Sequence, residues 1–340
     1  MNADLLRWAA ATAGFLGGFW LLVRSADWFV EGAASLAARL RVPPLIIGFV
    51  VVGFGTSAPE MLVSALAAAQ GMPVLALGNA LGSNITNILL ILGASMLVAP
   101  IALHRVALRR DIPFLFLLSL LFTAFAWDGA LGRWEGSVPA LLFLAFLGWQ
   151  IRETMRRKAP VSDETPDLPL GRALFLTLGG LLALLAASQV LVSAAQFMAR
   201  RIAEAAGLSP EATHLIIGVT VVALGTSLPE LMASVTAMRK GEHDIALGNV
   251  IGSNCFNLGI VAAIALLIRP VADGALPRAL QCRDAFVMNG ATLLLWALGL
   301  AAWLRCHGKK RPITLGRAWG VLFLALWLAY TLRVFLHTRT

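Results

Sequence analysis

Two near-copies of a short polar motif stand out in this sequence of 340 residues, GTSAPE at 55–60 and GTSLPE at 225–230. Each motif places a glutamate, Glu60 or Glu230, deep inside a stretch that is apolar for long enough to cross a bilayer. A carboxylate at that depth is costly unless it faces protein, water or a cation. The alternative is a structural salt bridge, but no Lys or Arg lies at comparable depth. The pattern therefore predicts that the two acids bind a cation.

Hydroxyl side chains accompany both acids within one helical turn, namely Thr56, Ser57, Thr226 and Ser227. Taken singly, each would more often bond back to its own helix backbone. Beside duplicated acids they are suited to an all-oxygen shell for a hard cation. Gly55 and Pro59 interrupt the first helix, because proline lacks the N–H that continues the backbone ladder. Each motif therefore predicts a broken helix, with carbonyls near Gly53 to Gly55 open to an ion in the first copy.

A second duplicated motif reads GNALGSNITN at 78–87 and GNVIGSNCFN at 248–257. Ser83 with Asn87, and Ser253 with Asn257, are spaced i to i+4, so each pair shares one helix face. Asparagine offers a neutral oxygen to a cation, or hydrogen-bonds between helices. The second alternative stays open above all for Asn79, Asn84, Asn249 and Asn254. The glycines at 78, 82, 248 and 252 predict close approach of another helix.

The composition explains why these polar residues are so informative. With 59% hydrophobic and only 13% charged residues, the chain has too little polar surface for a water-soluble globule. The net charge of +9 resides in short loops between apolar stretches, so it reports membrane topology and not a nucleic-acid partner. Five scattered histidines and three cysteines without metal spacing indicate neither haem nor zinc. No nucleotide-binding, hydrolase or metalloprotease motif is present, so we expect no enzyme activity and no cofactor.

Hydropathy predicts an all-α polytopic membrane protein with ten spans. The spans lie near 10–30, 44–69, 74–98, 112–127, 137–152, 172–197, 213–238, 245–268, 285–304 and 317–336. The first is interpreted as a retained helix and not a cleaved signal peptide. Four further acids, Asp27, Glu31, Asp111 and Asp284, fall at or near span ends, where we expect solvated or snorkelling side chains and not a role in transport.

The chain contains an internal duplication. A shift of about 170 residues aligns 46–101 with 216–271 without a gap, and about 23 of the 56 pairs are identical. Each half holds five spans, an odd number, so the second copy enters the membrane from the opposite side and the repeat is inverted. The predicted organisation is a first transmembrane repeat at 1–151, a cytoplasmic linker at 152–171 and a second repeat at 172–340.

The distribution of basic residues predicts the topology. Loops after odd-numbered spans carry 17 of the 27 Lys and Arg residues. We therefore expect a multi-pass protein of the inner (plasma) membrane with both termini on the non-cytoplasmic side.

The paired motifs resemble those of sodium/calcium exchangers of the prokaryotic type in the cation/Ca²⁺ exchanger superfamily, whose repeats carry G-T-S-x-P-E and then G-N-x-x-G-S-N. The resemblance covers essentially the whole chain. It implies a calcium site centred on Glu60 and Glu230 with Thr56 and Thr226. It further implies flanking sodium sites that draw on Ser57, Ser227, Ser83, Ser253 and the backbone carbonyls of Gly53 and Ala223.

Some members of the family have Asp at the position of Asn257, as the potassium-dependent branch also does, whereas this chain has Asn at both 87 and 257. Potassium coupling is therefore not expected, and the short linker has no room for cytosolic regulatory domains. The resemblance implies exchange of Na⁺ for Ca²⁺ by alternating access, at a site formed by the second, third, seventh and eighth spans. The first and sixth spans would move over this core. The alternative is a proton/Ca²⁺ antiporter that uses the same carboxylates. The expected partners are the two ions and the lipid bilayer, with no nucleic acid and no obligatory protein partner.

Overall fold

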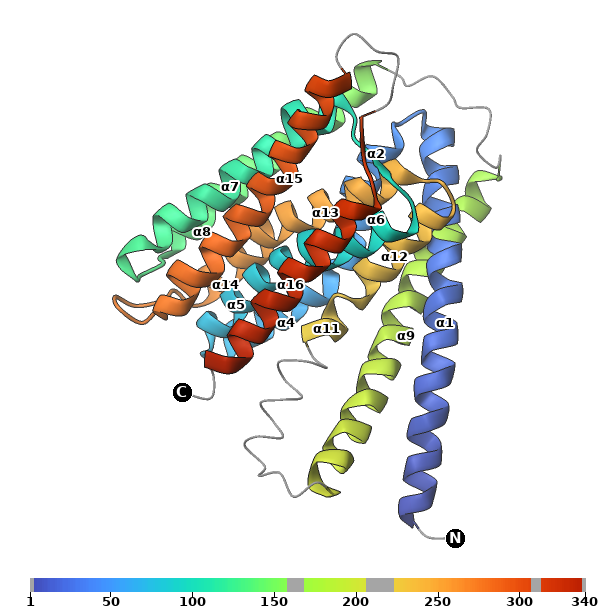
Figure 1. The fold of residues 1–340 in the computed structure, drawn as a ribbon, viewed down its shortest axis with the longest axis vertical. Coiled ribbons are helices and arrows are strands. Elements are labelled where there is room, and N and C mark those ends of the chain that lie inside the picture. The colour runs from blue at the N-terminus through green and yellow to red at the C-terminus, as the bar shows by residue number, and fades with distance from the viewer. Residues whose placement is uncertain (1–2, 158–167, 206–222, 307–312, 338–340) are drawn as a thin grey trace.

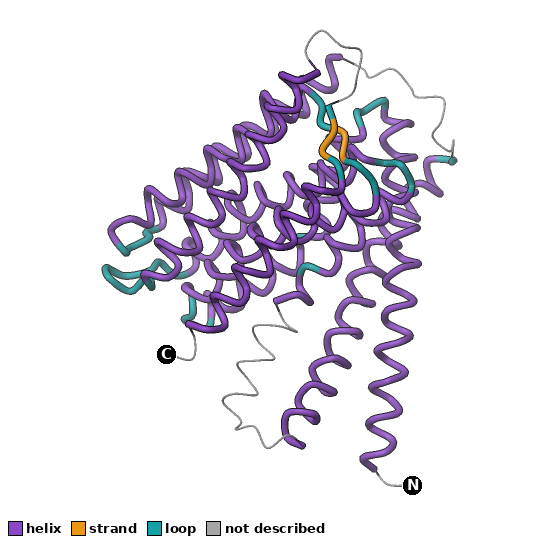
Figure 2. Tube along the Cα trace, viewed as in Figure 1, coloured by secondary structure: helices purple, strands orange, loops and turns teal. Residues whose placement is uncertain are grey.

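The computed structural model describes residues 3–157, 168–205, 223–306 and 313–337, and helices form nearly all of this part (Figures 1 and 2). The helices of the first half are α1 (Ala3–Leu40), α2 (Pro44–Ile47), α3 (Gly53–Thr56), α4 (Ala58–Ala69), α5 (Pro73–Thr86), α6 (Gly93–Val98), α7 (Ile112–Phe125) and α8 (Arg133–Arg157). Those of the second half are α9 (Leu170–Ala205), α11 (Ala223–Thr226), α12 (Leu228–Arg239), α13 (His243–Phe256), α14 (Ala262–Ile268), α15 (Ala285–Cys306) and α16 (Arg317–His337).

Wider helical turns join several of these segments into longer rods. The π-helical stretches are η1 (Gly48–Val52), η2 (Asn87–Leu92), η3 (Ala107–Asp111), η6 (Asn257–Val261) and η7 (Ala279–Asp284), and η4 (Ala126–Asp128) is a 3₁₀ turn. Two short strands, β1 (Ile101–Ala102) and β2 (Thr314–Leu315), pair antiparallel. Because π-bulges in helices frequently mark functional sites, η2 and η6 are of interest, since each begins at an asparagine of the duplicated motif.

Seven continuous helical rods in the described residues are long and apolar enough to cross a membrane, and the bent pair 44–56 with 58–69 is an eighth candidate. The chain is therefore an integral membrane protein, as its composition predicts. Of the two other expected spans, the one near 137–152 falls within α8, and the one near 213–238 lies partly outside the described residues. The full count of ten stays a prediction. Half of the linker expected at 152–171, residues 158–167, also lies outside the described residues.

The centre of the molecule is α13, in which every residue from Ile245 to Phe256 is buried. Glycine lets its backbone touch that of η1. A Cβ on Gly48 would lie 2.5 Å from the Ile245 carbonyl oxygen, and one on Gly252 would overlap the Phe49 carbonyl oxygen. The close approach expected at 248 and 252 is therefore confirmed. In the first repeat, a Cβ on Gly78 would meet only Leu280, at 3.5 Å. Residues 218–222, which correspond to η1 in the second repeat, lie outside the described residues.

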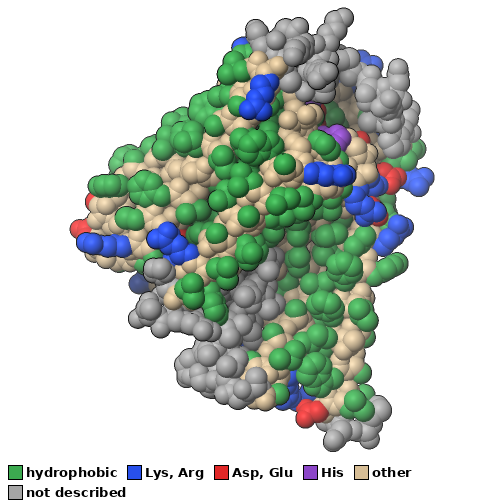
Figure 3. Space-filling model, in the orientation of Figure 1, with side chains coloured by type: hydrophobic (Ala, Val, Ile, Leu, Met, Phe, Trp, Pro, Cys, Tyr) green, Lys and Arg blue, Asp and Glu red, His purple; other side chains and the backbone are tan. Residues whose placement is uncertain are grey.

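Helices α1 and α9 form an outer layer beside this core (Figure 1). They run antiparallel, with Gly18 against Leu191 and Gly32 against Thr177. Only 11% of the most apolar window of α1 and 28% of that of α9 are buried inside the protein, against 67% for 73–98 and 78% for 243–268. Hydrophobic side chains cover much of the visible surface of this layer (Figure 3). The two helices thus face lipid over most of their length.

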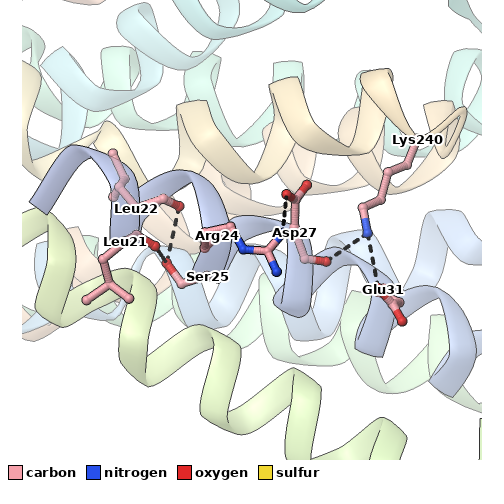
Figure 4. A network of polar contacts seen from close by, with 7 residues as sticks. All are labelled: Leu21, Leu22, Arg24, Ser25, Asp27, Glu31 and Lys240. Carbon is pink, nitrogen blue, oxygen red and sulfur yellow. Dashed lines mark hydrogen bonds and ion pairs between the residues drawn. The ribbon is translucent and has the colours of Figure 1, made fainter. Parts of the chain in front are cut away.

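Polar contacts of Lys240 tie α1 of this outer layer to the core (Figure 4). Lys240, just after α12, donates to the Asp27 backbone oxygen at 3.0 Å and lies 3.3 Å from a Glu31 carboxylate oxygen. Arg24 lies 3.9 Å from the Asp27 carboxylate. Asp27 and Glu31 are partly exposed, at 24% and 36% of their side chains, in keeping with the expectation for acids near span ends.

The close contact at Gly252 gives a stability prediction. Gly252→Ala places a methyl group against the Phe49 carbonyl oxygen, and overpacking a tight interior costs about 1–3 kcal/mol. We expect the apparent Tm of the purified protein to fall by roughly 5 °C. Gly148→Ala is the matched control, because nothing described lies within 4 Å of the added atom. Equal Tm values for the two variants would show that the helices do not meet at Gly252.

A second prediction concerns His104, in the segment between β1 and η3. Its Nε2 lies 2.9 Å from a carboxylate oxygen of Asp244, and this hydrogen-bonded carboxylate raises the pKa of His104. A pKa raised by folding adds stability below the unfolded pKa and loses it as the pH rises through the folded pKa. His104→Gln should therefore lower the Tm more at about pH 6 than at about pH 8.5. A difference independent of pH would mean that the ion pair contributes nothing.

Candidate functional site

The two glutamates sit at matching joints in broken helices. Helix α3 ends at Thr56, Ser57 leaves the helical conformation at φ −83° and ψ 2°, and α4 begins at the next residue with Glu60 in its first turn. The bend at this joint is 42°. Proline is tolerated in a first turn, where its missing N–H has no helical acceptor, and Pro59 occupies that place. The broken helix expected here is therefore present.

The second half repeats this local geometry. Ser227 has φ −89° and ψ 4°, Pro229 lies in the first turn of α12, and Glu230 follows it. The positive end of a helix dipole favours a carboxylate in the first turn. Both glutamates are thus placed at helix N-termini by a serine joint followed by a proline.

The carboxylates are buried and incompletely paired. Glu60 is 1% exposed and Glu230 is 2% exposed. Both carboxylate oxygens of Glu60, and Oε2 of Glu230, have no hydrogen-bond partner within the described part of the chain. Neither glutamate forms an ion pair with a described Lys, Arg or His. Because a lone buried charge costs several kcal/mol, these oxygens require a cation or protons.

Contacts between the halves bring the two joints to one place. The hydroxyl of Ser57 donates to Glu230 Oε1 at 3.4 Å, although the two residues belong to different repeats. Ser57 precedes Glu60 by less than one turn, so both acids face the same region. In the described residues no group of three or more His, Cys, Asp or Glu forms a metal cluster. Any cation held here would need neutral oxygens to complete its shell.

Four asparagines, here called the asparagine quartet, join the two halves of the chain in two reciprocal pairs. The Nδ2 of Asn84 donates to the Asn254 backbone oxygen at 3.2 Å, and the Nδ2 of Asn254 donates to the Asn84 backbone oxygen at 3.3 Å. Asn87 Nδ2 donates to Asn254 Oδ1 at 2.9 Å, and Asn257 Nδ2 donates to Asn84 Oδ1 at 3.0 Å. All four side-chain amides therefore act as donors between the repeats.

This pattern leaves two acceptors unused. The Oδ1 atoms of Asn87 and Asn257 are buried and lack a partner among the described residues. Each belongs to the first residue of a π-helical stretch, η2 or η6. The quartet therefore fixes both amides with their carbonyl oxygens unpaired, which suits them to bind a cation. Asn84 and Asn254 instead serve the interhelical hydrogen bonds that the sequence left as an alternative.

Asn249 links several predicted site residues, a role that the sequence motifs do not specify. Its Nδ2 donates to the Glu230 backbone oxygen at 3.2 Å and to Ser234 Oγ at 2.8 Å. Its Oδ1 accepts from Thr56 Oγ1 at 3.1 Å and lies 3.5 Å from Ser253 Oγ. Asn79, its counterpart, donates to Ser64 Oγ at 3.2 Å. Both residues therefore fix the site by bonds between helices.

The remaining predicted site residues differ in their burial and in their hydrogen bonds. Ser253 Oγ donates to the Gly53 carbonyl oxygen at 3.4 Å, and this oxygen also accepts the Ser57 N–H at 3.1 Å. An ion bound to the Gly53 carbonyl oxygen would therefore replace the hydrogen bond from Ser253, while the Ser253 hydroxyl oxygen stays near enough to bind the same ion. Ser83 and Ser227 are buried, and Thr226 is half-buried at the end of α11. Ala223 begins α11, so its carbonyl lies at the start of the second broken helix.

The expectation of a solvated Asp111 is wrong. Asp111 is 1% exposed and accepts hydrogen bonds from Arg110 Nε at 2.6 Å and Gln150 Nε2 at 2.7 Å. Asp284 repeats the arrangement in the second half, with Arg283 Nε at 2.7 Å and the Tyr330 hydroxyl at 3.0 Å. The sequence feature that could have indicated these buried ion pairs is the Arg-Asp dipeptide at 110–111 and 283–284. It lies beyond the part of the duplication that aligns without a gap.

Comparisons with known proteins identify a family for the whole chain. The family model described as sodium/calcium exchanger protein matches residues 10–152 and 173–336. A putative antiporter CaxA from Alkalimonas amylolytica is 42% identical over 334 residues, which cover 96% of this chain and 98% of that protein. The inner membrane protein YrbG of Escherichia coli K12 is 38% identical over 333 residues, covering 94% and 96%. A solved structure of the sodium-calcium exchanger NCX_Mj, soaked with Na⁺ and Sr²⁺, superposes with a TM-score of 0.76 at 31% identity and covers 94% and 97% of the two chains.

The unpaired carboxylates predict the thermal behaviour of the cation-free protein. Glu60→Gln and Glu230→Gln each remove a buried charge, so in sodium-free buffer the Tm should stay level or rise. Added CaCl₂ should raise the wild-type Tm by several degrees through binding to the native state, and this increase should be lost in both variants. Glu204→Gln, at a side chain that is 52% exposed, is the control that should keep it. A calcium-dependent increase that survives both substitutions would place the cation elsewhere.

Proposed function

The chain belongs to the sodium/calcium exchanger family, and from this premise we propose that it is a secondary antiporter that exchanges Na⁺ for Ca²⁺ across the membrane. The observation that carries the proposal is the set of unpaired buried oxygens at the junction of the two halves. They comprise three carboxylate oxygens from Glu60 and Glu230 and two amide oxygens from Asn87 and Asn257.

The two glutamates would form the calcium site. Ca²⁺ takes about 6–8 oxygen ligands and favours carboxylates among them. The two carboxylates balance the charge of one Ca²⁺, while the hydroxyls of Thr56 and Thr226 lie one turn away on the same broken helices. The remaining ligands would come from amide oxygens, backbone carbonyls and water.

The sodium sites would overlap this calcium site. Ser57 already contacts Glu230 across the repeats, and the Ser253 hydroxyl already contacts the Gly53 carbonyl. Because the chain is duplicated, the equivalent residues would form the second sodium site. They are Ser227, Ser83 and the backbone carbonyl of Ala223. Because Asn87 and Asn257 are neutral, both ion types depend on the same two negative charges. Na⁺ and Ca²⁺ would therefore exclude one another, which is the condition for exchange.

Alternating access would follow from the layered fold. We propose ten spans in two inverted repeats, 1–151 and 172–340, joined by a cytoplasmic linker at 152–171. The core of α5, α13 and the broken helices holds the site, while α1 and α9 pack on it as a separate antiparallel pair (Figure 1). Movement of this pair over the core would expose the site to one side at a time.

The basic residues of the loops support a location in the inner (plasma) membrane with both termini on the non-cytoplasmic side. This orientation places Lys240 and its contact with Glu31 at the cytoplasmic end of α1 (Figure 4).

The alternative function is exchange of H⁺ for Ca²⁺ or another divalent cation. It is favoured by one observation, that both Glu60 oxygens lack a partner, because a proton would neutralise this carboxylate without further ligands. The hydroxyl of Ser57 beside Glu230 favours sodium, which needs coordinating oxygens that a proton does not.

Flux measurements in proteoliposomes separate the two functions. Vesicles loaded with NaCl should take up ⁴⁵Ca²⁺ on dilution into sodium-free buffer, whereas vesicles with only a K⁺ or H⁺ gradient should not. Glu60→Gln and Glu230→Gln should lower uptake by at least about 100-fold, since each removes a charged ligand worth roughly 3 kcal/mol or more. Glu204→Gln, on the exposed end of α9, should retain it.

Two outcomes would contradict the proposal. Uptake driven by a pH gradient in sodium-free buffer would establish proton coupling. Uptake that ignores every gradient, or persists in both glutamine variants, would show that this site does not carry out exchange.

A further inference from the structure

The orientation of Asn84 in the asparagine quartet is set by a chemical constraint. A backbone carbonyl oxygen only accepts hydrogen bonds, and an asparagine side chain donates only through Nδ2. The Nδ2 of Asn84 lies 3.2 Å from the Asn254 backbone oxygen and 3.7 Å from the sulfur of Met288. Turning this amide over would place Oδ1 against two acceptors. Asn84 is therefore held in one orientation.

Asn84 in turn determines the orientation of Asn257, which belongs to the other half of the chain. The Oδ1 of Asn84 accepts a hydrogen bond from Asn257 Nδ2 at 3.0 Å. This bond commits the nitrogen of the Asn257 amide. Its Oδ1 is consequently the atom that stays buried and without a partner in the described residues. A backbone carbonyl thus orients Asn84, and Asn84 orients Asn257.

The same succession of contacts runs in the opposite direction between the halves. Asn254 Nδ2 donates to the Asn84 backbone oxygen at 3.3 Å, and Asn254 Oδ1 accepts from Asn87 Nδ2 at 2.9 Å. The Oδ1 of Asn87 is again buried with no described partner. Each half therefore orients an amide of the other half. The crossed pairs are Asn84 with Asn257 and Asn254 with Asn87.

Helix packing directs the two oriented amides to the helices that carry the glutamates. The stretch η6, which begins at Asn257, packs against α4, and the first turn of α4 holds Glu60. The stretch η2, which begins at Asn87, packs against α12, and the first turn of α12 holds Glu230. Each amide thus lies between an asparagine and a glutamate-bearing helix of the other half.

The quartet also limits which residue types fit at positions 87 and 257. A carboxylate has no hydrogen to donate. An acid at either position would place an oxygen against the Oδ1 of Asn254 or Asn84. Neither of these acceptors can turn away without losing its side chain's bond to a backbone carbonyl. The arrangement therefore requires an uncharged donor at both positions, and the sequence supplies asparagine at both.

We propose that Asn84 and Asn254 are positioning residues for ion exchange, each of which turns the amide oxygen of its crossed partner toward the cation and requires that partner to be uncharged. The inference rests on the proposed function, because it takes the Oδ1 atoms of Asn87 and Asn257 as ion ligands. The positioning residues themselves bind no ion, since their own Oδ1 atoms accept hydrogen bonds from the partner amides.

One substitution separates orientation from general packing. Asn84→Ala removes the acceptor of Asn257 Nδ2 but keeps the backbone oxygen to which Asn254 donates. Asn257 then loses the bond that holds its nitrogen away from the ion, whereas Asn87 keeps its orientation. A carboxylate at 257 needs no such bond, because both of its oxygens are acceptors. Asn257→Asp should therefore make Asn84 dispensable for ion binding.

The test is equilibrium ⁴⁵Ca²⁺ binding to the purified full-length protein in sodium-free buffer. In an otherwise wild-type chain, Asn84→Ala should raise the apparent Kd at least about tenfold, the effect of leaving a buried donor without its acceptor. In the Asn257→Asp background, the same substitution should change the Kd by less than about threefold. In the Asn87→Asp background, which adds the same charge at the equivalent position of the other repeat, it should keep its full effect.

The mirrored pair provides an independent second test. Asn254→Ala should weaken Ca²⁺ binding by a similar factor, and its effect should disappear in the Asn87→Asp background but persist in the Asn257→Asp background. The proposal thus stays testable even where Asn84→Ala does not fold.

Asn289→Ala is the matched control for the loss of a buried amide. Asn289 accepts from Ser119 Oγ and donates to Thr123 Oγ1 and the Ala285 backbone oxygen, all outside the quartet. This variant should lower the Tm but leave the Kd for Ca²⁺ within about twofold of the wild-type value.

Three outcomes have distinct meanings. If Asn84→Ala weakens binding equally in all three backgrounds, or if Asn87→Asp compensates for it, the proposal is overturned, because the quartet would then only join the helices. A wild-type protein that binds Ca²⁺ without exchanging it for Na⁺ would reject the proposed function, while the comparison of backgrounds would still decide the roles of Asn84 and Asn254. A wild-type protein that binds no Ca²⁺ would reject both.

Discussion

The rest of this structure depends on a pair of buried carboxylates whose charge is not balanced by any described residue. Glu60 and Glu230 are buried in an apolar, membrane-spanning core, and three of their four carboxylate oxygens lack a partner in the described residues. In such a setting the cost of desolvating a charge exceeds what a nearby hydroxyl returns. An external cation or proton must therefore complete the site. The serine joints and the first-turn prolines place both carboxylates at helix N-termini, and the asparagine quartet leaves two further buried oxygens without a partner in the described residues.

Because the chain is duplicated, each half contributes one of these buried carboxylates. The joints at Ser57 and Ser227 have nearly the same backbone angles, and the quartet links the halves through reciprocal bonds. Away from the site the halves diverge. In the first half Phe114 and Phe146 stack on one another, whereas in the second half a groove lined by Val287, Leu326 and Ala329 lies between α15 and α16. The halves are therefore alike at the serine joints and differ at the periphery.

Much of the fold was predictable because prolines and glycines mark its breaks. The spans expected at 44–69 and 74–98 match Pro44–Ala69 and Pro73–Val98 closely. The first helix was underestimated, since Asp4, Arg7 and Arg39 end its apolar pattern but not its backbone ladder. Depth and duplication predicted that Glu60 and Glu230 lie inside the protein, and both are buried. The quartet was not predictable, because its partners are distant in sequence and depend on how the helices lie side by side. The repeated Arg-Asp dipeptide could have indicated a paired Asp111, but the contact with Gln150 depends on the packing of distant helices.

The central claim is that one pair of carboxylates serves both ions, and equilibrium ⁴⁵Ca²⁺ binding to the purified protein at increasing NaCl tests it most directly. The account predicts that Na⁺ raises the apparent Kd for Ca²⁺ progressively, with K⁺ or choline at the same ionic strength without effect, while the maximum amount of bound Ca²⁺ stays constant. Calcium binding that is unchanged at saturating Na⁺ would contradict it, because the two ions would then occupy separate charges.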